Sequence, residues 1–187
     1  MQISASNLRR KEYIKFRDGI YQVLFAEFYH PGKGRTVMRT KLRSIATGKA
    51  IDQVFSSNDS IESADVQSVP AQFLYNQHDV LVFMDEINYE QYEVPVLLAE
   101  DIAGLLKEGQ SMYVLLHEGK PIGVIPPKKV VLKVVEADDA VKGDTATNAK
   151  KSVKVETGAS ILVPLFIKTG DTIVINPETG EYTGREN

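Results

Sequence analysis

Tyr21-Gln22-Val23-Leu24-Phe25 and Thr36-Val37-Met38-Arg39 are strand-like runs, and the turn His30-Pro31-Gly32-Lys33-Gly34-Arg35 lies between them. Runs of β-branched and aromatic residues on either side of glycine and proline indicate a β-hairpin. Glycine on both sides of Lys33 permits positive φ and close approach of another molecule, while Pro31 stiffens the entry to the turn. The pattern predicts a hairpin tip that presents one ammonium group. A solvated turn with an incidental lysine is the alternative, and composition alone favours it.

The same pattern of short strand-like runs and turns continues along the chain. Five further short runs are bounded by turn residues, at 73–75, 80–84, 113–116, 130–135 and 173–175. Four turns place glycine where a hairpin needs a left-handed residue: Asp18-Gly19, Thr47-Gly48, Glu118-Gly119 and Thr179-Gly180. Many short strands with close turns predict an all-β fold of barrels or sandwiches.

One segment departs from this rhythm, because its apolar residues recur at helical spacing: Leu98, Ile102, Leu105 and Leu106. A short amphipathic helix is predicted to start after Pro95 and to stop at Gly109. We expect this helix to close the end of a barrel, which is a packing role.

Polar and proline-containing stretches divide the chain into three predicted domains: 1–64, 65–128 and 129–187. The first boundary follows the polar stretch 56–60 and precedes Ser68-Val69-Pro70. The second lies near Pro126-Pro127, a pair that cannot donate hydrogen bonds to a neighbouring strand. A loop at 142–151 is predicted to project from the last domain.

The net charge of −3 conceals an uneven distribution. Residues 1–64 carry 11 Lys and Arg against 6 Asp and Glu, residues 65–128 carry 3 against 10, and residues 129–187 carry 8 against 9. A basic first domain suits a polyanion, because cations near phosphates release counterions; a solvated basic face is the alternative. Since the acidic middle domain would be repelled by phosphate, we expect oriented contact led by the first domain.

The composition also limits the cellular compartment in which the protein is expected and the chemistry that its side chains can perform. Cysteine is absent, which excludes disulfides, thiolate metal sites and a cysteine nucleophile. No basic-then-apolar leader opens the chain, and its apolar stretches are too short to span a membrane. We therefore expect a cytoplasmic protein.

Candidate catalytic groups do not form a constellation. His30, His78 and His117 are scattered without carboxylates at ligand spacing, which argues against a metal site and favours satisfied surface histidines. Phosphate-cradle and nucleophile-elbow motifs are absent. The neighbouring carboxylates Asp85-Glu86 and Asp138-Asp139 point in different directions and are expected to cap turns or to solvate edges. We expect no catalytic residues, no metal and no cofactor, so an enzyme is the weaker class.

Six motifs follow one another in an informative order. They are Pro31-Gly32-Lys33-Gly34, Arg39-Thr40-Lys41-Leu42, Phe83-Met84-Asp85 with Tyr89-Glu90-Gln91, Gly143-Asp144-Thr145-Ala146, Thr157-Gly158 with Val163-Pro164-Leu165-Phe166, and Gly180-Glu181-Tyr182-Thr183-Gly184-Arg185. Together, over essentially the whole chain, they resemble bacterial translation elongation factor P. The resemblance implies an SH3-like, KOW-type first domain followed by two OB-folds, in an L-shaped arrangement similar to tRNA.

The resemblance also implies a function. Such a factor enters a ribosome stalled on consecutive prolines, binds between the P and E sites, and stabilises the P-site peptidyl-tRNA in a reactive geometry. The implied tRNA-binding tip consists of His30, Pro31, Gly32, Lys33, Gly34 and Arg35. Family members often modify the tip lysine by β-lysylation or similar chemistry that includes hydroxylation, so an enzyme that modifies Lys33 is an implied partner. Val124-Ile125-Pro126-Pro127 and residues 60–66 resemble the lysylated subgroup.

Further contacts are implied in the last domain. Gly143, Asp144 and Thr145 would meet the E-site codon of the mRNA, while Tyr182 would stack on rRNA and Arg185 would contact its phosphate. Without the resemblance, an ordinary turn and a C-terminal strand pair would be preferred for these residues. The implied partners are the 70S ribosome, its P-site tRNA, rRNA and mRNA, and we expect a monomer.

Two other classes of protein fit part of the sequence. A generic OB-fold RNA-binding protein predicts aromatic residues over a barrel face and no special role for Lys33. A paralogue similar to elongation factor P would differ at the tip, and the intact motif at 31–34 favours the factor itself. Two residues depart from the family pattern: Val153 replaces the usual alanine at a position expected to be packed, and His30 stands where lysine is common.

Overall fold

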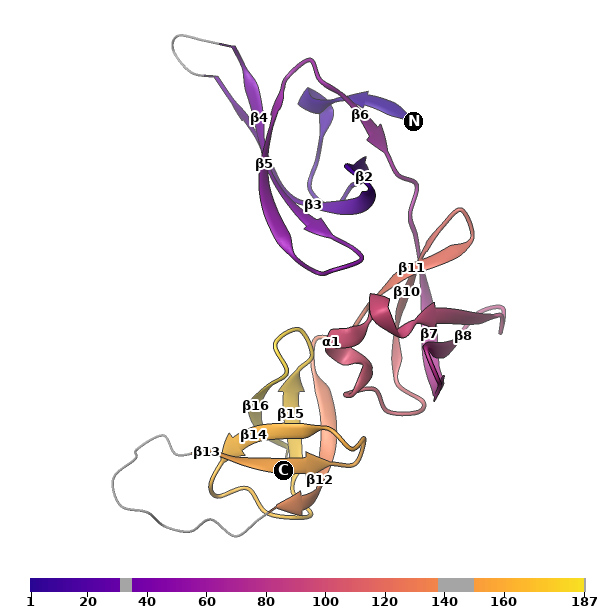
Figure 1. The fold of residues 1–187 in the computed structure, drawn as a ribbon, viewed down its shortest axis with the longest axis vertical. Coiled ribbons are helices and arrows are strands. Elements are labelled where there is room, and N and C mark those ends of the chain that lie inside the picture. The colour runs from indigo at the N-terminus through magenta and orange to yellow at the C-terminus, as the bar shows by residue number, and fades with distance from the viewer. Residues whose placement is uncertain (31–34, 138–149, 187) are drawn as a thin grey trace. The chain divides into compact units, whose positions relative to one another are not determined.

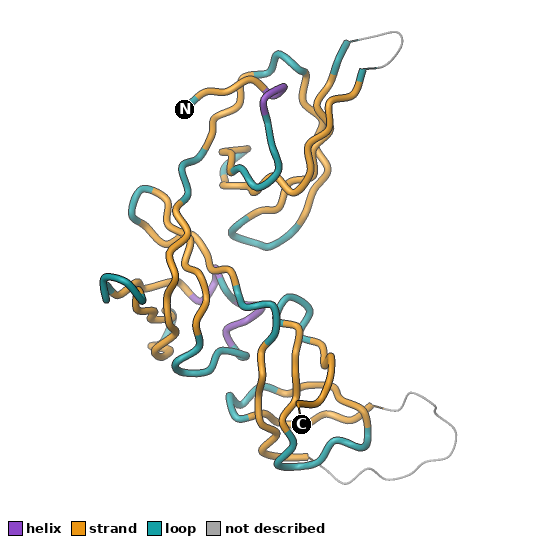
Figure 2. The backbone as a smooth tube through the Cα atoms, turned by 180° about the vertical axis from the view of Figure 1, so that it is seen from behind, coloured by secondary structure: helices purple, strands orange, loops and turns teal. Residues whose placement is uncertain are grey.

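A computed structural model of the chain describes residues 1–30, 35–137 and 150–186, and nearly all of its regular structure is β-strand (Figures 1 and 2). The strands of the first sheet are β1 (Gln2–Ser4), β2 (Tyr13–Phe16), β3 (Gly19–Tyr29), β4 (Val37–Ser44), β5 (Ala50–Ser56) and β6 (Ser60–Ser63). Their order in the sheet is β1-β6-β2-β3-β4-β5. A 3-10 turn, η1 (Ala5–Asn7), follows β1.

Two further sheets follow along the chain. The second contains β7 (Gln67–Gln77), β8 (Val80–Asp85), β9 (Gln91–Pro95), β10 (Ser111–His117) and β11 (Lys120–Ile125), in the order β11-β10-β7-β8-β9. The third contains β12 (Val130–Ala137), β13 (Lys150–Val155), β14 (Ser160–Pro164), β15 (Thr172–Asn176) and β16 (Glu181–Glu186), in the order β14-β13-β12-β15-β16. All seven predicted strand runs lie in strands apart from Thr36, which precedes β4 by one residue, so the all-β prediction is confirmed.

By compactness, the chain divides into two units. One comprises Met1–Val69 with Val114–Gly123, and the other comprises Pro70–Tyr113 with Val124–Asn187. In the part of the chain that the structure describes, no helix is long and apolar enough to cross a membrane.

The core of the first sheet follows the alternation of its strands. On β4, Met38, Thr40 and Leu42 are buried, whereas Arg39 and Lys41 are exposed, as expected for a strand with one face on a core. The buried Thr40 hydroxyl donates a hydrogen bond to the Gln53 carbonyl at 2.8 Å, which satisfies it on β5. This alternation leaves the basic residues of β4 on the outer face.

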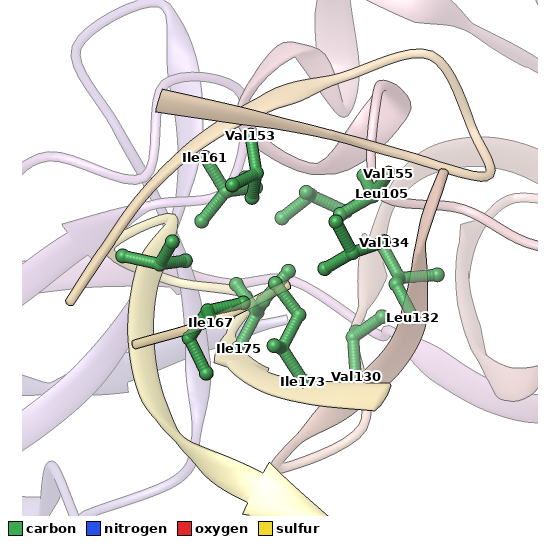
Figure 3. Close-up of a cluster of buried hydrophobic side chains, with 11 residues drawn as sticks. Leu105, Val130, Leu132, Val134, Val153, Val155, Ile161, Ile167, Ile173 and Ile175 are labelled. Carbon is green, nitrogen blue, oxygen red and sulfur yellow. The ribbon is translucent and has the colours of Figure 1, made fainter. Parts of the chain in front are cut away.

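The core of the third sheet is built almost entirely from valine and isoleucine (Figure 3). Val153 is 2% exposed within it, so the prediction that this position is packed is confirmed. Leu105, which comes from outside the third sheet, is 5% exposed in the same cluster. The third core therefore depends on a side chain of the segment between β9 and β10.

That segment is less helical than predicted. A 3-10 turn, η2 (Val96–Leu98), is followed by a four-residue helix, α1 (Glu100–Ala103), and the chain leaves the helix at Gly104. No side chain caps either element, so little favours a longer helix. The predicted helix up to Gly109 is wrong in length, although Ile102, Leu105 and Leu106 are buried as its apolar face requires.

Turns and boundaries show further differences. Gly48, Gly119 and Gly180 have positive φ as predicted, but before β3 it is Arg17, with φ of 52°, that takes the left-handed conformation and not Gly19. Pro70, predicted to precede a strand, lies within β7, where its carbonyl accepts the Glu86 amide at 3.0 Å. Of the predicted loop at 142–151, Lys150 and Lys151 begin β13, and the rest lies outside the described residues together with Asp138 and Asp139.

Candidate nucleic-acid interface

The hairpin formed by β3 and β4 carries the predicted tip. The two strands pair from Tyr21 opposite Ser44 to Tyr29 opposite Val37, which leaves the tip beyond the last pair. Pro31, Gly32, Lys33 and Gly34 lie outside the described residues, whereas the exposed His30 and Arg35 flank them. The described part of the site is therefore the hairpin that supports the tip.

A hydrogen bond closes the neck of this hairpin. The Nδ1 atom of His30 lies 2.6 Å from the hydroxyl of Thr36, just beyond the Tyr29–Val37 pair. The Thr36 carbonyl also accepts the amide of Ser57 at 3.2 Å, which ties the neck to the turn after β5. Thr36, on one side of the tip, is therefore held both to His30 and to the turn after β5.

A β-bulge determines which side chains share the outer face of the hairpin. The register shifts between Val23 and Phe25, so that Phe25 pairs with Lys41 and Glu27 pairs with Arg39. Directly paired residues lie on the same face of a sheet. Beyond the bulge, the outer face of β3 and β4 thus combines aromatic and basic side chains.

Arg39 and Tyr29 form a cation–π pair on this face. The guanidinium carbon of Arg39 lies 3.6 Å from the centre of the Tyr29 ring, close enough for a stacked arrangement. Phe25, which is 49% exposed, and Val54, which is 54% exposed, add apolar surface on the same side. An aromatic surface next to a fixed guanidinium can stack on a base or ribose and donate to a phosphate oxygen.

Charge on this face is mixed. Glu27 on β3 lies opposite Arg39 of β4, and Asp52 on β5 lies opposite Lys41 of β4. Each of these two cations therefore has a carboxylate at the neighbouring position of the sheet. A polyanion would therefore meet this face in one orientation, with its phosphates at the part that presents Arg39 and Lys41.

Two of the 11 basic residues of the first domain have partners away from the hairpin tip. Lys15 lies 2.9 Å from a carboxylate oxygen of Glu62, and this hydrogen-bonded ion pair raises the pKa of Lys15 and lowers the pKa of Glu62. Arg17 lies over the ring of Phe16 at 5.1 Å. The carboxylate of Glu62 therefore offsets the charge of Lys15, whereas the ring of Phe16 leaves the charge of Arg17 in place.

Sequence patterns alone did not single out Phe25, Tyr29 and Val54 as part of this surface. Their runs predict strands, but a bulge inverts the alternation along β3 and carries no evident sequence signal. The cation–π pair also joins residues ten positions apart, which only the register of the hairpin reveals.

The two described candidates in the last domain both lie on β16. Tyr182 pairs with Ile175 and packs half-buried against the third core, while Arg185 pairs with Ile173 and its Nη1 lies 3.9 Å from a carboxylate oxygen of Asp171. Part of the Tyr182 ring is thus committed to packing. The other predicted contacts, Gly143, Asp144 and Thr145, lie outside the described residues.

The histidines show no clustering with other ligand types. Among the residues that the structure describes, no group of three or more His, Asp or Glu side chains could hold a metal ion. The Nδ1 atom of His117 lies 2.6 Å from the carbonyl oxygen of Asp65. His78 is exposed in a turn with φ of 57°.

Three family models match the chain in succession. They are the elongation factor P KOW-like domain at residues 4–61, the elongation factor P OB domain at 66–124, and the elongation factor P C-terminal domain at 130–185. The first two confirm the predicted KOW-type first domain and the OB-fold that follows it.

Curated relatives match over the full length. Elongation factor P of Desulfovibrio desulfuricans is 39% identical over 183 residues, which cover 98% of this chain and 99% of the relative. Elongation factor P of Leptospira biflexa is 37% identical over 187 residues and covers all of both chains. Among solved structures, the eukaryotic translation initiation factor 5A from Methanococcus jannaschii is 21% identical with a TM-score of 0.49, covering 67% of this chain and 94% of that one.

Proposed function

Because this chain belongs to the elongation factor P family, we propose that it binds the ribosome between the P and E sites and promotes peptide bond formation on stalled polyproline sequences. The observation that carries the proposal is the succession of three family models from residue 4 to residue 185. Family membership makes the chain a translation elongation factor. The ribosomal site and the polyproline substrate are the finer part of the proposal.

The proposed mechanism is positioning of the P-site tRNA by the hairpin. Proline reacts poorly in peptide bond formation, so holding the tRNA end and the nascent chain in a reactive geometry lowers an orientational barrier. Lys33 would reach toward that end from a neck fixed by the bond between His30 and Thr36. Arg39 and Tyr29, which stack at 3.6 Å, would hold the tRNA backbone beside the hairpin.

Further proposals concern the tip and its modification. We propose that Lys33 is lengthened by β-lysylation or similar chemistry, and that a modifying enzyme is therefore a partner. Glycine on each side would admit the active site of such an enzyme. Intact-mass measurement of the chain from its native host, localised to Lys33, tests this part; an unmodified lysine would contradict it.

The remaining proposals concern the other domains. We propose domain boundaries at 1–64, 65–128 and 129–187, which the three sheets and the three matched ranges support. Gly143, Asp144 and Thr145 are proposed to meet the E-site codon, and the exposed guanidinium of Arg185 and the open part of Tyr182 to contact rRNA. We also propose a cytoplasmic monomer.

A reporter with three consecutive prolines tests the function in cells that lack their own factor. Lys33→Ala is expected to lower reporter output severely, because it removes the reaching group. Two controls match it: Lys49→Ala removes an exposed lysine in the turn between β4 and β5, and His78→Asn suits the left-handed backbone at that position. Equal reporter output from the Lys33→Ala and Lys49→Ala variants would contradict the proposed function.

A further inference from the structure

The hairpin of β10 and β11 groups with the first sheet, although its strands pair within the second. Its residues Val114–Gly123 form one compact unit with Met1–Val69. In the second sheet, β10 lies between β11 and β7. Three residues, 64–66, link β6 to β7. The contacts of the hairpin with this linker and with the first sheet therefore hold the compact unit together.

His117 binds the linker directly. It is the last residue of β10, and its side chain is only 15% exposed. Its Nδ1 atom lies 2.6 Å from the carbonyl oxygen of Asp65. Because a carbonyl oxygen only accepts hydrogen bonds, Nδ1 must carry the proton, and the neutral ring is the Nδ1–H tautomer. The other ring nitrogen, Nε2, lies 3.7 Å from a carboxylate oxygen of Glu118.

Both ends of this hydrogen bond start from ordered backbone. Glu118 and Gly119 have φ of 52° and 74°, and two successive left-handed residues are typical of a tight type I′ hairpin turn. On the linker side, Ala64 is buried, and its amide donates to the Tyr13 carbonyl at 2.9 Å. The bond from His117 thus joins a tight turn to a linker that is anchored in the first sheet.

The cavity next to this bond is polar. It has a volume of about 260 Å³, and charged residues of the first sheet, the linker and the hairpin line it together: Lys15, Glu62, Asp65, His117 and Glu118. Hydrophobic burial therefore contributes little to holding the hairpin at this place. A directed hydrogen bond matters more here than it would beside an apolar core.

A second contact of the hairpin lies on β11. A Cβ atom at Gly123 would lie 3.0 Å from Cγ2 of Ile45, which belongs to the turn after β4. A side chain would be crowded at this distance, so glycine permits the close approach. The amide of Ile45 donates to the Ile20 carbonyl at 3.0 Å, which ties this turn to β3. The hairpin is thus attached to the first domain at His117 and at Gly123.

We infer that His117 is a positioning residue, whose Nδ1–H bond to the Asp65 carbonyl holds the linker on the β10–β11 hairpin and restricts the motion of the first domain. The inference rests on the proposed function, because the tip can hold tRNA in a reactive geometry only if the domain that carries Lys33 is itself restricted. Loss of the bond would leave the RNA-binding surfaces in place. It would lower the fraction of bound chains whose tip is correctly placed.

The tautomer of His117 tests the hydrogen bond in the free, full chain. Long-range ¹H–¹⁵N correlation spectra at alkaline pH, assigned by comparison with His117→Leu, show which nitrogen of the neutral ring carries the proton. A proton on Nδ1 and none on Nε2 is expected. A proton on Nε2 would overturn the inference.

The rate of Pro–Pro bond formation on purified ribosomes tests the positioning role. His117→Leu removes the donor but keeps a side chain of similar size. With this variant, the maximal rate at saturating chain is expected to fall about three- to tenfold, and the concentration for half-maximal effect to change less than about twofold. His117→Asn keeps an N–H donor near the place of Nδ1 and should restore most of the rate. Lys120→Ala, at an exposed residue of the same hairpin, should change neither quantity.

The variants distinguish failure of this inference from failure of the proposed function. Equal maximal rates for His117→Leu and the unaltered chain would overturn the inference and leave the proposed function intact. A loss with His117→Leu that is equally large with His117→Asn would also overturn it, because the missing donor would then not be the cause. No acceleration by the unaltered chain from its native host would overturn the proposed function, and the inference with it.

Discussion

At the scale of single residues, the stacked pair of Arg39 and Tyr29 gives the hairpin face its chemical character. The guanidinium lies 3.6 Å from the ring centre, so the ring restricts its orientation. A restricted guanidinium loses less side-chain freedom on binding phosphate than a free lysine does. Tyr29 is 39% exposed beside it, which leaves part of the ring open to solvent.

Substitution of Arg39 should reveal a phosphate contact. Arg39→Ala is expected to weaken ribosome binding and to reduce the slope of log affinity against log salt by about one, because one phosphate contact is lost. Arg39→Lys should keep the salt slope but still weaken binding, since lysine lacks the planar group that stacks on Tyr29. Titrations across salt concentrations measure both effects, with Lys49→Ala as the control. An unchanged slope for Arg39→Ala would exclude the contact.

What the sequence could predict differs from residue to residue. The hairpin and the outward direction of Arg39 follow from strand alternation, and Asp85 as a turn cap follows from its position at the end of a strand run. The stacking of Arg39 on Tyr29 could not be predicted, because it depends on a bulge in β3 and on strand register. The charge count of residues 1–64 includes Lys15, but it could not reveal the ion pair of Lys15 with Glu62, because the two strands are distant in sequence.

At the scale of elements, the segment between β9 and β10 connects to the third core. Its helix is only four residues long, so burial and not helix propensity holds it in place. Leu105 enters the cluster of the third sheet (Figure 3), and the Thr157 hydroxyl donates to the Gly104 carbonyl at 2.7 Å. Periodicity correctly predicted that Leu105 is buried, but not which core receives it.

Truncation of the Leu105 side chain should show how much its packing in the third core contributes to stability. Leu105→Ala is expected to lower the free energy of unfolding by about 2–4 kcal/mol, because it leaves a cavity in a core of rigid branched side chains. Leu97→Ala, at a side chain that is 71% exposed, should change it by less than about 0.5 kcal/mol. Urea denaturation followed by circular dichroism compares the two variants. Equal, small effects would mean that Leu105 contributes little to the core.

Glu156 is expected to make the stability of the same region depend on pH. Its carboxylate accepts the Lys133 amide at 3.0 Å and the Lys107 ammonium at 3.1 Å, and these contacts hold the pKa of Glu156 below its ordinary value. A lowered folded-state pKa stabilises the fold above the unfolded pKa, and this stabilisation is lost as pH falls through the folded value.

Measuring the free energy of unfolding at decreasing pH should distinguish the contribution of Glu156 from that of the more exposed Lys15–Glu62 ion pair. Glu156→Gln is expected to lose stability at neutral pH and to show a weaker further loss below about pH 4.5 than the unaltered chain does. Glu62→Gln is the control, because the Glu62 side chain is 46% exposed against 28% for Glu156, and its effect should be smaller. Urea midpoints between about pH 3 and 7 provide the comparison. Identical pH profiles for Glu156→Gln and the unaltered chain would contradict this role.

At the scale of the whole molecule, three β-sheets carry three different surfaces. The first sheet presents cations and aromatic rings, the second presents an acidic turn with exposed Ile87 and Tyr89, and the third carries Tyr182 and Arg185 on β16. The charge counts of the sequence predicted the contrast between the first two domains. They could not predict the conformation of this turn, because neither the exposure of Ile87 nor the backbone of Tyr89 follows from composition.

Kinetics of a single peptide bond test the central claim most directly. On purified ribosomes, the rate of Pro–Pro bond formation is measured by quench-flow under three conditions. The ribosomes receive the unaltered chain from its native host, the Lys33→Ala variant, or no added factor. The proposed function predicts an acceleration of about tenfold or more by the unaltered chain, little by Lys33→Ala, and no effect on a Phe–Phe bond. Equal acceleration of Pro–Pro synthesis by the Lys33→Ala chain, or no acceleration by the unaltered chain, would contradict it.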